Sequence, residues 1–96
     1  MILDEQKPYT VYILHCSDGT LYTGVCIDPA KRLHAHNRLQ SGAKYTRTRR
    51  PVSYGYQEIC KNRSEAQKRE HYVRTLPRLD KLQLCSQWKK VKRDHE

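Results

Sequence analysis

Two short stretches near the N-terminus, with a turn signal between them, limit most tightly the folds open to this chain. Tyr9 to Cys16 and Leu21 to Cys26 are rich in β-branched and aromatic side chains, which favours extended strands. The intervening Ser17-Asp18-Gly19-Thr20 is typical of a tight turn between antiparallel strands. We therefore expect a β-hairpin over these residues.

The length of that turn decides which side chains share a face of the hairpin. A two-residue turn at Asp18-Gly19 puts Tyr12 and Tyr22 on opposite faces, because side chains alternate along each strand. A three-residue turn with Gly19 as a left-handed bulge puts both tyrosines on one face. This second register also gathers the aliphatic side chains on the other face, namely Val11, Ile13, Leu21 and Val25. We therefore expect the three-residue turn, with open space at Gly24 beside the tyrosines.

A helix is expected soon after the hairpin. Asp28 has the chemistry of an N-cap and Pro29 that of a first helical residue, so the helix should run from there to about Leu39. Arg32 and His36 lie one helical turn apart, so their side chains share one face of this helix.

The second half of the chain predicts one more strand and two more helices. Residues 40–50 read as an ordered loop that leads into a third strand, Val52 to Glu58. Ser64 is the expected N-cap of a second helix, which Pro77 ends before a third helix over 78–85. We expect the basic end of the chain to fray from Gln87 onward.

One acidic side chain falls on the stripe of the second helix that should face inward. Ala66, Glu70 and Val73 recur at helical spacing, so the carboxylate of Glu70 lies among apolar neighbours. A carboxylate in such a place must be paired with a cation, protonated or bound to a metal. The structural alternative to a metal site is a salt bridge to Arg32 or Arg74.

The charge of the chain indicates a polyanion as its partner. Nineteen Lys and Arg against ten Asp and Glu give a formal net charge of +9 over 96 residues. Such an excess favours nucleic acid, whose counterions are released on binding, although an ordinary basic protein has a similar composition. The run Lys44 to Arg50 (KYTRTRR) combines cations with hydroxyl groups that suit a phosphate backbone, and Tyr45 offers a ring for a base or sugar.

The cysteines and the N-terminus indicate a cytoplasmic protein with no membrane partner. The four cysteines form no C-x-x-C pair and lack zinc-finger spacing, so we expect reduced thiols. Residues 1–7 contain Asp4 and Glu5 and no apolar run, which predicts neither a signal peptide nor a membrane span. We divide the chain into an N-terminal extension (1–8), one domain (9–86) and a basic tail (87–96).

Several motifs stand in order along the chain. They are Val11-Tyr12-Ile13-Leu14, Asp18 to Val25 (DGTLYTGV), Lys31-Arg32-Leu33, His36-Asn37, Gly42 to Arg47 (GAKYTR), and Ser64-Glu65-Ala66 with Glu70. As a combined pattern over about Tyr9 to Leu84, they resemble the GIY-YIG nuclease superfamily, and more narrowly its short single-domain bacterial members. The resemblance implies an α+β fold, with a small three-stranded antiparallel sheet flanked by helices, that hydrolyses phosphodiesters with one divalent metal ion.

The resemblance also assigns roles by matching position. Tyr12 and Tyr22 stand for the tyrosines of the two motif halves, Arg32 for the helix arginine and Glu70 for the metal-binding glutamate. His36 joins them as a fifth candidate catalytic residue. The expected nucleic-acid contacts are Gly24, Lys31, Asn37, Lys44, Tyr45, Thr46, Arg47, Arg49 and Arg50.

These roles suggest a division of the chemistry. We expect Glu70 to hold one Mg²⁺ or Mn²⁺ that stabilises the leaving oxygen, and Arg32 to bind the nonbridging phosphate oxygens. Tyr12 is the first candidate for the base that deprotonates the attacking water, although an ordinary phenol with a pKa near ~10 is a poor base at neutral pH. The sequence does not decide which of three residues is the general base, namely Tyr12, Tyr22 or His36.

Some positions depart from the pattern of the superfamily. Thr10 and Val11 stand where the first motif half would have glycine and isoleucine, and Thr23 replaces an isoleucine, which removes no reactive group. Leu82 falls where some catalytic relatives have an asparagine.

Together these inferences predict a metal-dependent DNA endonuclease, with RNA as an alternative substrate. A domain this small has little surface for sequence readout, so we expect it to recognise a structure or an end and to serve DNA repair or processing. One alternative is a catalytically weak module that binds nucleic acid, and another is a non-nuclease protein that uses the hairpin face for protein contacts. We expect a monomer or a weak homodimer.

Overall fold

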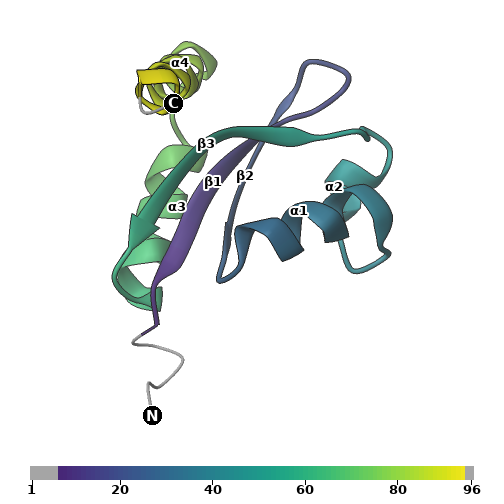
Figure 1. The fold of residues 1–96 in the computed structure, drawn as a ribbon, viewed down its shortest axis with the longest axis horizontal. Helices are drawn as coiled ribbons and strands as arrows, with labels where there is room; N and C mark the ends of the chain where they lie inside the picture. Colours follow the sequence, from purple (N-terminus) through teal and green to yellow (C-terminus); the bar gives the residue numbers. More distant parts are fainter. Residues whose placement is uncertain (1–6, 95–96) are drawn as a thin grey trace.

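The sheet has three antiparallel strands in the order β2-β1-β3, and helices cover both of its faces (Figure 1). The computed structural model describes residues 7–94, so most of the expected N-terminal extension and the last two residues of the tail lie outside the described residues. The elements are β1 (Tyr9–His15), β2 (Leu21–Cys26), α1 (Pro29–Arg38), α2 (Lys44–Arg47), β3 (Ser53–Cys60), α3 (Arg63–Arg74) and α4 (Arg78–Asp94). This is the α+β fold expected from the sequence.

The hairpin adopts the three-residue turn. The Cys16 amide donates to the Thr20 carbonyl over 3.0 Å, and Gly19 has a φ of +86°, the left-handed conformation that glycine adopts without strain. Tyr12 consequently lies opposite Gly24 in the pairing of β1 with β2. Tyr12 and Tyr22 therefore share one face of the sheet, as the aliphatic pattern predicted.

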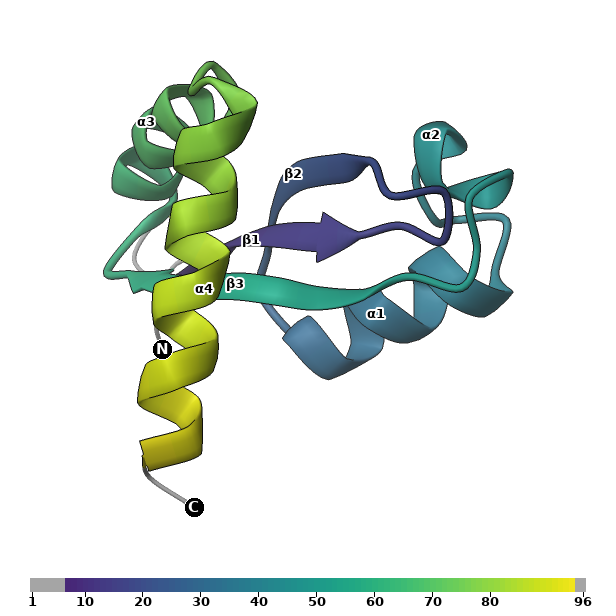
Figure 2. The same ribbon diagram turned by 90° about the horizontal axis from the view of Figure 1, so that it is seen from above.

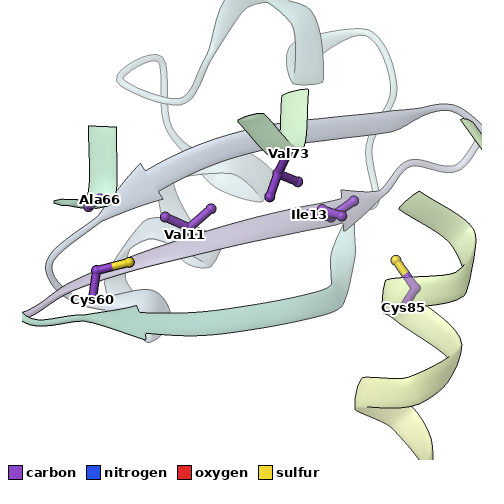
Figure 3. Close-up of a cluster of buried hydrophobic side chains, with 6 residues drawn as sticks. All are labelled: Val11, Ile13, Cys60, Ala66, Val73 and Cys85. Carbon is purple, nitrogen blue, oxygen red and sulfur yellow. The ribbon is translucent and has the colours of Figure 1, made fainter. Parts of the chain in front are cut away.

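Different helices cover the two faces of the sheet. On one face, Val11 and Ile13 pack against α3 and α4 through Ala66, Val73 and Cys85 (Figure 3). Each fully buried aliphatic side chain there contributes about 1.5–3 kcal/mol to folding. On the other face, which carries Tyr12 and Leu14, Leu33 of α1 packs against the strands. Figures 1 and 2 show α1 and α2 on the side away from α3 and α4.

Two helix starts differ from their predictions. α3 begins at Arg63, because the Asn62 side chain accepts from the Glu65 amide at 2.9 Å and so caps the helix ahead of Ser64. Asparagine has the same capping chemistry as serine, so the earlier position takes the role. Within the expected loop 40–50, α2 forms one helical turn. The cap of α1 is as predicted, since Asp28 accepts from the Lys31 amide at 3.2 Å.

The predicted fraying from Gln87 is wrong for the described part of the tail. α4 continues unbroken to Asp94, and Figure 2 shows it extending beyond the strands. Lys and Gln are good helix formers, and the Lys92 ammonium lies 4.9 Å from the Trp88 ring one turn earlier. No helix among residues 7–94 has both the length and the apolar character needed to cross a membrane. The four cysteines are free and buried.

Candidate active site

A cavity of about 440 Å³ opens beside β2, an outer strand of the sheet. Four of the five predicted catalytic side chains line it, namely Tyr12, Tyr22, Arg32 and Glu70. The two tyrosines belong to the face covered by α1, whereas Glu70 comes from α3 on the opposite face. The cavity therefore brings together residues from both faces around the outer edge of β2.

Gly24 makes room for the tyrosine that lies opposite it. A Cβ atom at this position would lie 2.5 Å from the Tyr12 hydroxyl oxygen, far inside van der Waals contact. The space expected beside the tyrosines is thus filled by the Tyr12 ring itself. This steric requirement gives the Tyr22-Thr23-Gly24 motif a physical reason for its glycine.

A chain of buried hydrogen bonds runs back from the Tyr12 hydroxyl. The hydroxyl lies 2.8 Å from Nε2 of His36, whose Nδ1 lies 2.9 Å from the Thr46 hydroxyl. Thr46 donates its proton to the Ala43 carbonyl at 2.8 Å, so it accepts from Nδ1 of His36. A neutral His36 with its proton on Nδ1 accepts at Nε2, and Tyr12 must be the donor. These three hydrogen bonds therefore fix which group is the donor and which the acceptor in each of them.

The two titrating groups in these hydrogen bonds, the Tyr12 phenol and the His36 imidazole, are both neutral at pH 7. Burial raises the pKa of Tyr12 to about 12, against the opposing influence of the nearby Arg32. Burial lowers the pKa of His36 to about 4, and the positive charges of Arg32 and Arg50 act in the same direction. A standing phenolate at Tyr12 is therefore excluded near neutrality.

His36 lies behind Tyr12 and does not line the cavity. Its side chain is fully buried, with 0% exposure, so it does not reach a phosphate or water in the cavity. The expectation that His36 is itself a catalytic residue is thus corrected, because it contacts the Tyr12 and Tyr22 rings, which line the cavity, and does not line the cavity itself. His36 acts on the site through its hydrogen bond to Tyr12 and its contacts with these two rings.

The cation and the carboxylate of the site are both partly shielded from water. Arg32 is half-buried and donates one hydrogen bond to the Ser41 carbonyl at 3.2 Å, which holds its guanidinium at the cavity wall. The Glu70 side chain is 19% exposed, and Arg74 approaches its carboxylate to 3.6 Å. The salt bridge to Arg74 considered as an alternative is therefore present. Arg74 itself is 58% exposed, so this pair is weak and open to exchange for another cation.

The donor set of the cavity fits one hard divalent cation. Within residues 7–94, no group of three or more His, Cys, Asp and Glu side chains gathers as a metal cage. Glu70 offers a single carboxylate to the cavity, so the remaining ligands of a cation would be water and substrate oxygens. Mg²⁺ and Mn²⁺ are bound in this way, because such hard cations keep much of their water.

Three of the expected nucleic-acid contacts instead hold the site together. The Asn37 amide accepts from the Val52 backbone at 2.7 Å and donates to its carbonyl at 3.0 Å. Arg50 donates to the His36 and Leu39 carbonyls, both at 2.6 Å, and so caps the end of α1. Thr46 is fully buried in the hydrogen-bond chain. Each of these side chains is occupied by protein groups, which corrects the prediction.

The expected stacking residue Tyr45 is already in contact with other side chains. Its ring stacks on Tyr22 with 5.7 Å between centroids, and the Arg49 guanidinium lies 3.8 Å above it. These contacts position Tyr22 and leave less ring surface for a base. Lys31, Lys44 and Arg47 are exposed and stay candidates for phosphate contact.

The sequence did not single out Lys81 of α4, which also lines the cavity. Lys81 lies one turn before the buried Cys85, so the helical period places it on the stripe that faces the sheet. This helical spacing is the feature of the sequence that could have indicated Lys81. Leu82, at the position of the asparagine of some relatives, lies instead at a separate hollow with His15 and Cys85.

Comparisons with known proteins identify the family of the chain. The GIY-YIG catalytic domain family matches residues 8–83, and the chain belongs to this family. A UPF0213 protein of Staphylococcus aureus is 52% identical over 77 residues, which cover 80% of this chain and 93% of that protein. A UPF0213 protein of Desulfotalea psychrophila is 49% identical over 72 residues, 75% of this chain and 66% of that protein.

Two solution structures have the same fold. The UPF0213 protein BH0048 of Bacillus halodurans is 39% identical, with a TM-score of 0.53 over 82% of this chain and 83% of that one. The protein EF2693 of E. faecalis is 38% identical, with a TM-score of 0.58 over 91% and 92%.

Proposed function

We propose that this protein is a divalent-metal-dependent endonuclease that hydrolyses phosphodiester bonds in DNA. The observation that carries the proposal is the convergence of Tyr12, Tyr22, Arg32 and Glu70 on one cavity. Membership of a nuclease superfamily supports the hydrolytic chemistry, and the net charge of +9 supports a polyanionic substrate.

Arg32 and Glu70 act on different charges that develop during the reaction. The guanidinium of Arg32 binds the nonbridging oxygens of the scissile phosphate through its fork of donors and neutralises the charge that grows there. Glu70 is the ligand for a divalent ion, which when bound supplies Lewis-acid stabilisation of the departing 3′ oxygen. Arg74 pairs with the carboxylate in the absence of that ion, and this pairing positions the Glu70 side chain.

Tyr12 takes the proton of the attacking water as it passes its own to His36. The phenol proton already lies on the hydrogen bond to Nε2, and although the Tyr12 side chain is 1% exposed it lines the cavity, from which the water would approach its hydroxyl oxygen. Arg32 and Arg50 disfavour an imidazolium in the free protein, but a phosphate bound at Arg32 offsets one of these charges. Substrate binding thereby raises the basicity of His36 when a proton acceptor is needed.

The finer features of the function follow from size and charge. A single small domain favours recognition of a DNA structure or end over a long sequence, which suits a role in repair or processing in the cytoplasm. The four free thiols fit a reducing compartment. Lys31, Lys44 and Arg47 are the exposed cations next to the site that would contact the backbone.

A cleavage assay tests the proposal. Branched, nicked, single-stranded and duplex DNA are incubated with Mg²⁺ or Mn²⁺, and products are compared for wild type, Arg32→Ala, Glu70→Ala and the exposed control Lys61→Ala. We expect products from wild type and control only, with losses on the order of 100-fold or more in the two site variants. Cutting by both variants at the wild-type rate contradicts the proposal. Salt-sensitive binding without product from any form identifies the alternative, a nucleic-acid-binding module.

A further inference from the structure

A second hollow lies along α1, on the far side of Arg32 from the active site. It encloses about 580 Å³, within the range of roughly 300–1,000 Å³ found for small-molecule sites. Its lining residues are Cys26, Ile27, Asp28, Lys31, Arg32, Ala35, Leu39 and Ser41. Arg32 lines both cavities, so this hollow, hereafter the α1 groove, adjoins the candidate active site at that residue.

The walls of the α1 groove combine exposed apolar side chains with positive charge. Ile27 is 53% exposed and Leu39 is 44% exposed, although both are large aliphatic residues in a strongly basic chain. Ala35, which is small and buried, forms part of the floor between them. Lys31 and Arg32 add two cations to the lining, and Asp28, which accepts from the Lys31 amide, adds one acidic side chain. The groove thus offers an apolar surface beside two cations.

We propose that the α1 groove receives an unpaired nucleotide of the DNA strand, next to the phosphate bound by Arg32. This inference rests on the proposed function, and it names the class of substrate. A nucleotide matches the chemistry of the groove, since its base is a flat apolar surface and its phosphate an anion. A base stacked and paired in a duplex cannot present its face to Ile27 and Leu39, whereas an unpaired or extruded base can. The groove therefore selects gapped, bulged or flapped DNA over intact duplex.

Binding measurements without catalysis test this inference separately from the nuclease activity. In EDTA, and in the Glu70→Ala background, fluorescence anisotropy compares a duplex with the same duplex carrying a single-nucleotide bulge, and with that bulge made abasic. We expect the bulge to bind roughly tenfold more tightly than either other form, because contact of the base with Ile27 and Leu39 removes apolar surface from water, and a tenfold ratio corresponds to about 1.4 kcal/mol. Equal binding of the three DNAs overturns the inference.

A double variant then assigns the preference to the groove. Ile27→Ser/Leu39→Ser alters two exposed side chains, and Ile59→Ser, which is 77% exposed on β3, is the matched control. We expect the double variant to lose the tenfold advantage of the base while it binds duplex as before, and the control to keep it. An advantage unchanged in the double variant overturns the inference. So does sedimentation in which the double variant converts a wild-type dimer to monomer, because the groove is then a contact between copies of the chain.

The outcomes separate the two proposals. A bulge preference in the binding assay with no cleavage product from any DNA supports the groove and contradicts the nuclease. Efficient cutting of intact duplex, at the same rate as bulged DNA, supports the nuclease and contradicts the groove.

Discussion

The two faces of the sheet differ in what they bury. The face under α3 and α4 buries aliphatic side chains such as Val11, Ile13 and Val73, which contribute folding energy without hydrogen-bonding requirements. The face under α1 buries a tyrosine, a histidine and a threonine that are linked in one hydrogen-bond chain. Polar groups are costly to bury unless they are paired, so this second face has only a few workable arrangements.

This division of the sheet explains how so small a domain can hold both a core and a site. The face under α3 and α4, hereafter the aliphatic face, supplies stability. Substitutions that change the shape of its side chains should cost only free energy of folding. The face under α1, hereafter the polar face, fixes the orientation of the Tyr12 hydroxyl, because each hydrogen-bonding group behind that hydroxyl is itself held in place. Substitutions on the two faces should therefore separate into changes of stability and changes of activity.

The largest expected effect tests the polar face. Tyr12→Phe removes the hydroxyl that we propose receives the water proton, and cleavage should fall about 100- to 10,000-fold. The stability cost should be only about 1–3 kcal/mol, because one buried acceptor on His36 loses its donor. Initial cleavage rates and urea denaturation measure both quantities.

Tyr54→Phe is the matched control for that change. Tyr54 is on the same face and donates to the Pro29 carbonyl at 2.7 Å, but it does not line the active-site cavity. We expect a similar loss of stability with a cleavage rate close to wild type. An equal loss of activity in both variants would mean that burial of any hydroxyl on this face matters, and not the position of Tyr12.

The aliphatic face is tested by Ile13→Ala. Ile13 is fully buried against α3, so the cavity left behind should lower the free energy of unfolding by about 2–5 kcal/mol. Cleavage by the fraction that stays folded should be unchanged at low temperature. A large drop in activity per folded molecule would show that the two faces are coupled, against the separation expected here.

A pH titration tests the burial of His36 on the polar face. Its folded pKa of about 4 lies below the unfolded value of about 6.5, so the unfolded chain binds the proton first as pH falls. The stabilising contribution is complete above pH 6.5 and is lost progressively toward pH 4. Between pH 7 and pH 5 the loss should be about 2 kcal/mol.

Denaturation curves at several pH values measure this loss, with His36→Gln as the reference. Glutamine can accept from Tyr12 but does not titrate in this range. Burial, together with Lys89 and Arg78, also lowers the pKa of His15, so only the difference between wild type and variant reports His36. Identical pH dependence in the two proteins would contradict a buried neutral histidine.

The smallest expected effect concerns Arg50, which caps α1 on the polar face. Arg50→Ala removes hydrogen bonds to the His36 and Leu39 carbonyls, and should cost about 1 kcal/mol. The pKa of His36 should rise, because one of the charges that lower it is gone. NMR titration of the His36 ring measures the change. Lys61→Ala, an exposed member of an ion pair with Glu65, should leave both quantities unchanged.

Local chemistry in the sequence was sufficient to predict the hairpin and the stripe of Glu70, whereas the roles of Tyr12, Tyr22 and Arg32 came from the resemblance to the family. The left-handed Gly19 and the alternation of aliphatic residues determined the face of each tyrosine, and helical spacing put Glu70 on the inner stripe of α3. Membership of the GIY-YIG family was likewise evident from the order of the motifs.

Contacts between distant segments could not be predicted in the same way. Asn37 and Arg50 have the composition of nucleic-acid contacts, yet both bind backbone groups that only the folded chain brings near. The partner of His36, Thr46, is ten residues away in a loop whose single helical turn has no strong sequence signal. Hydrogen bonds between distant segments depend on the tertiary structure. The residue types alone do not indicate which groups will meet.

The position of the active site at an outer strand has a topological consequence. Because no strand among residues 7–94 pairs with the outer side of β2, the cavity opens at the rim of the domain, and a polymer can approach it laterally. Access requires no threading of a free terminus through the protein. Covalently closed circular DNA should thus be as accessible to this site as a linear fragment of the same local structure.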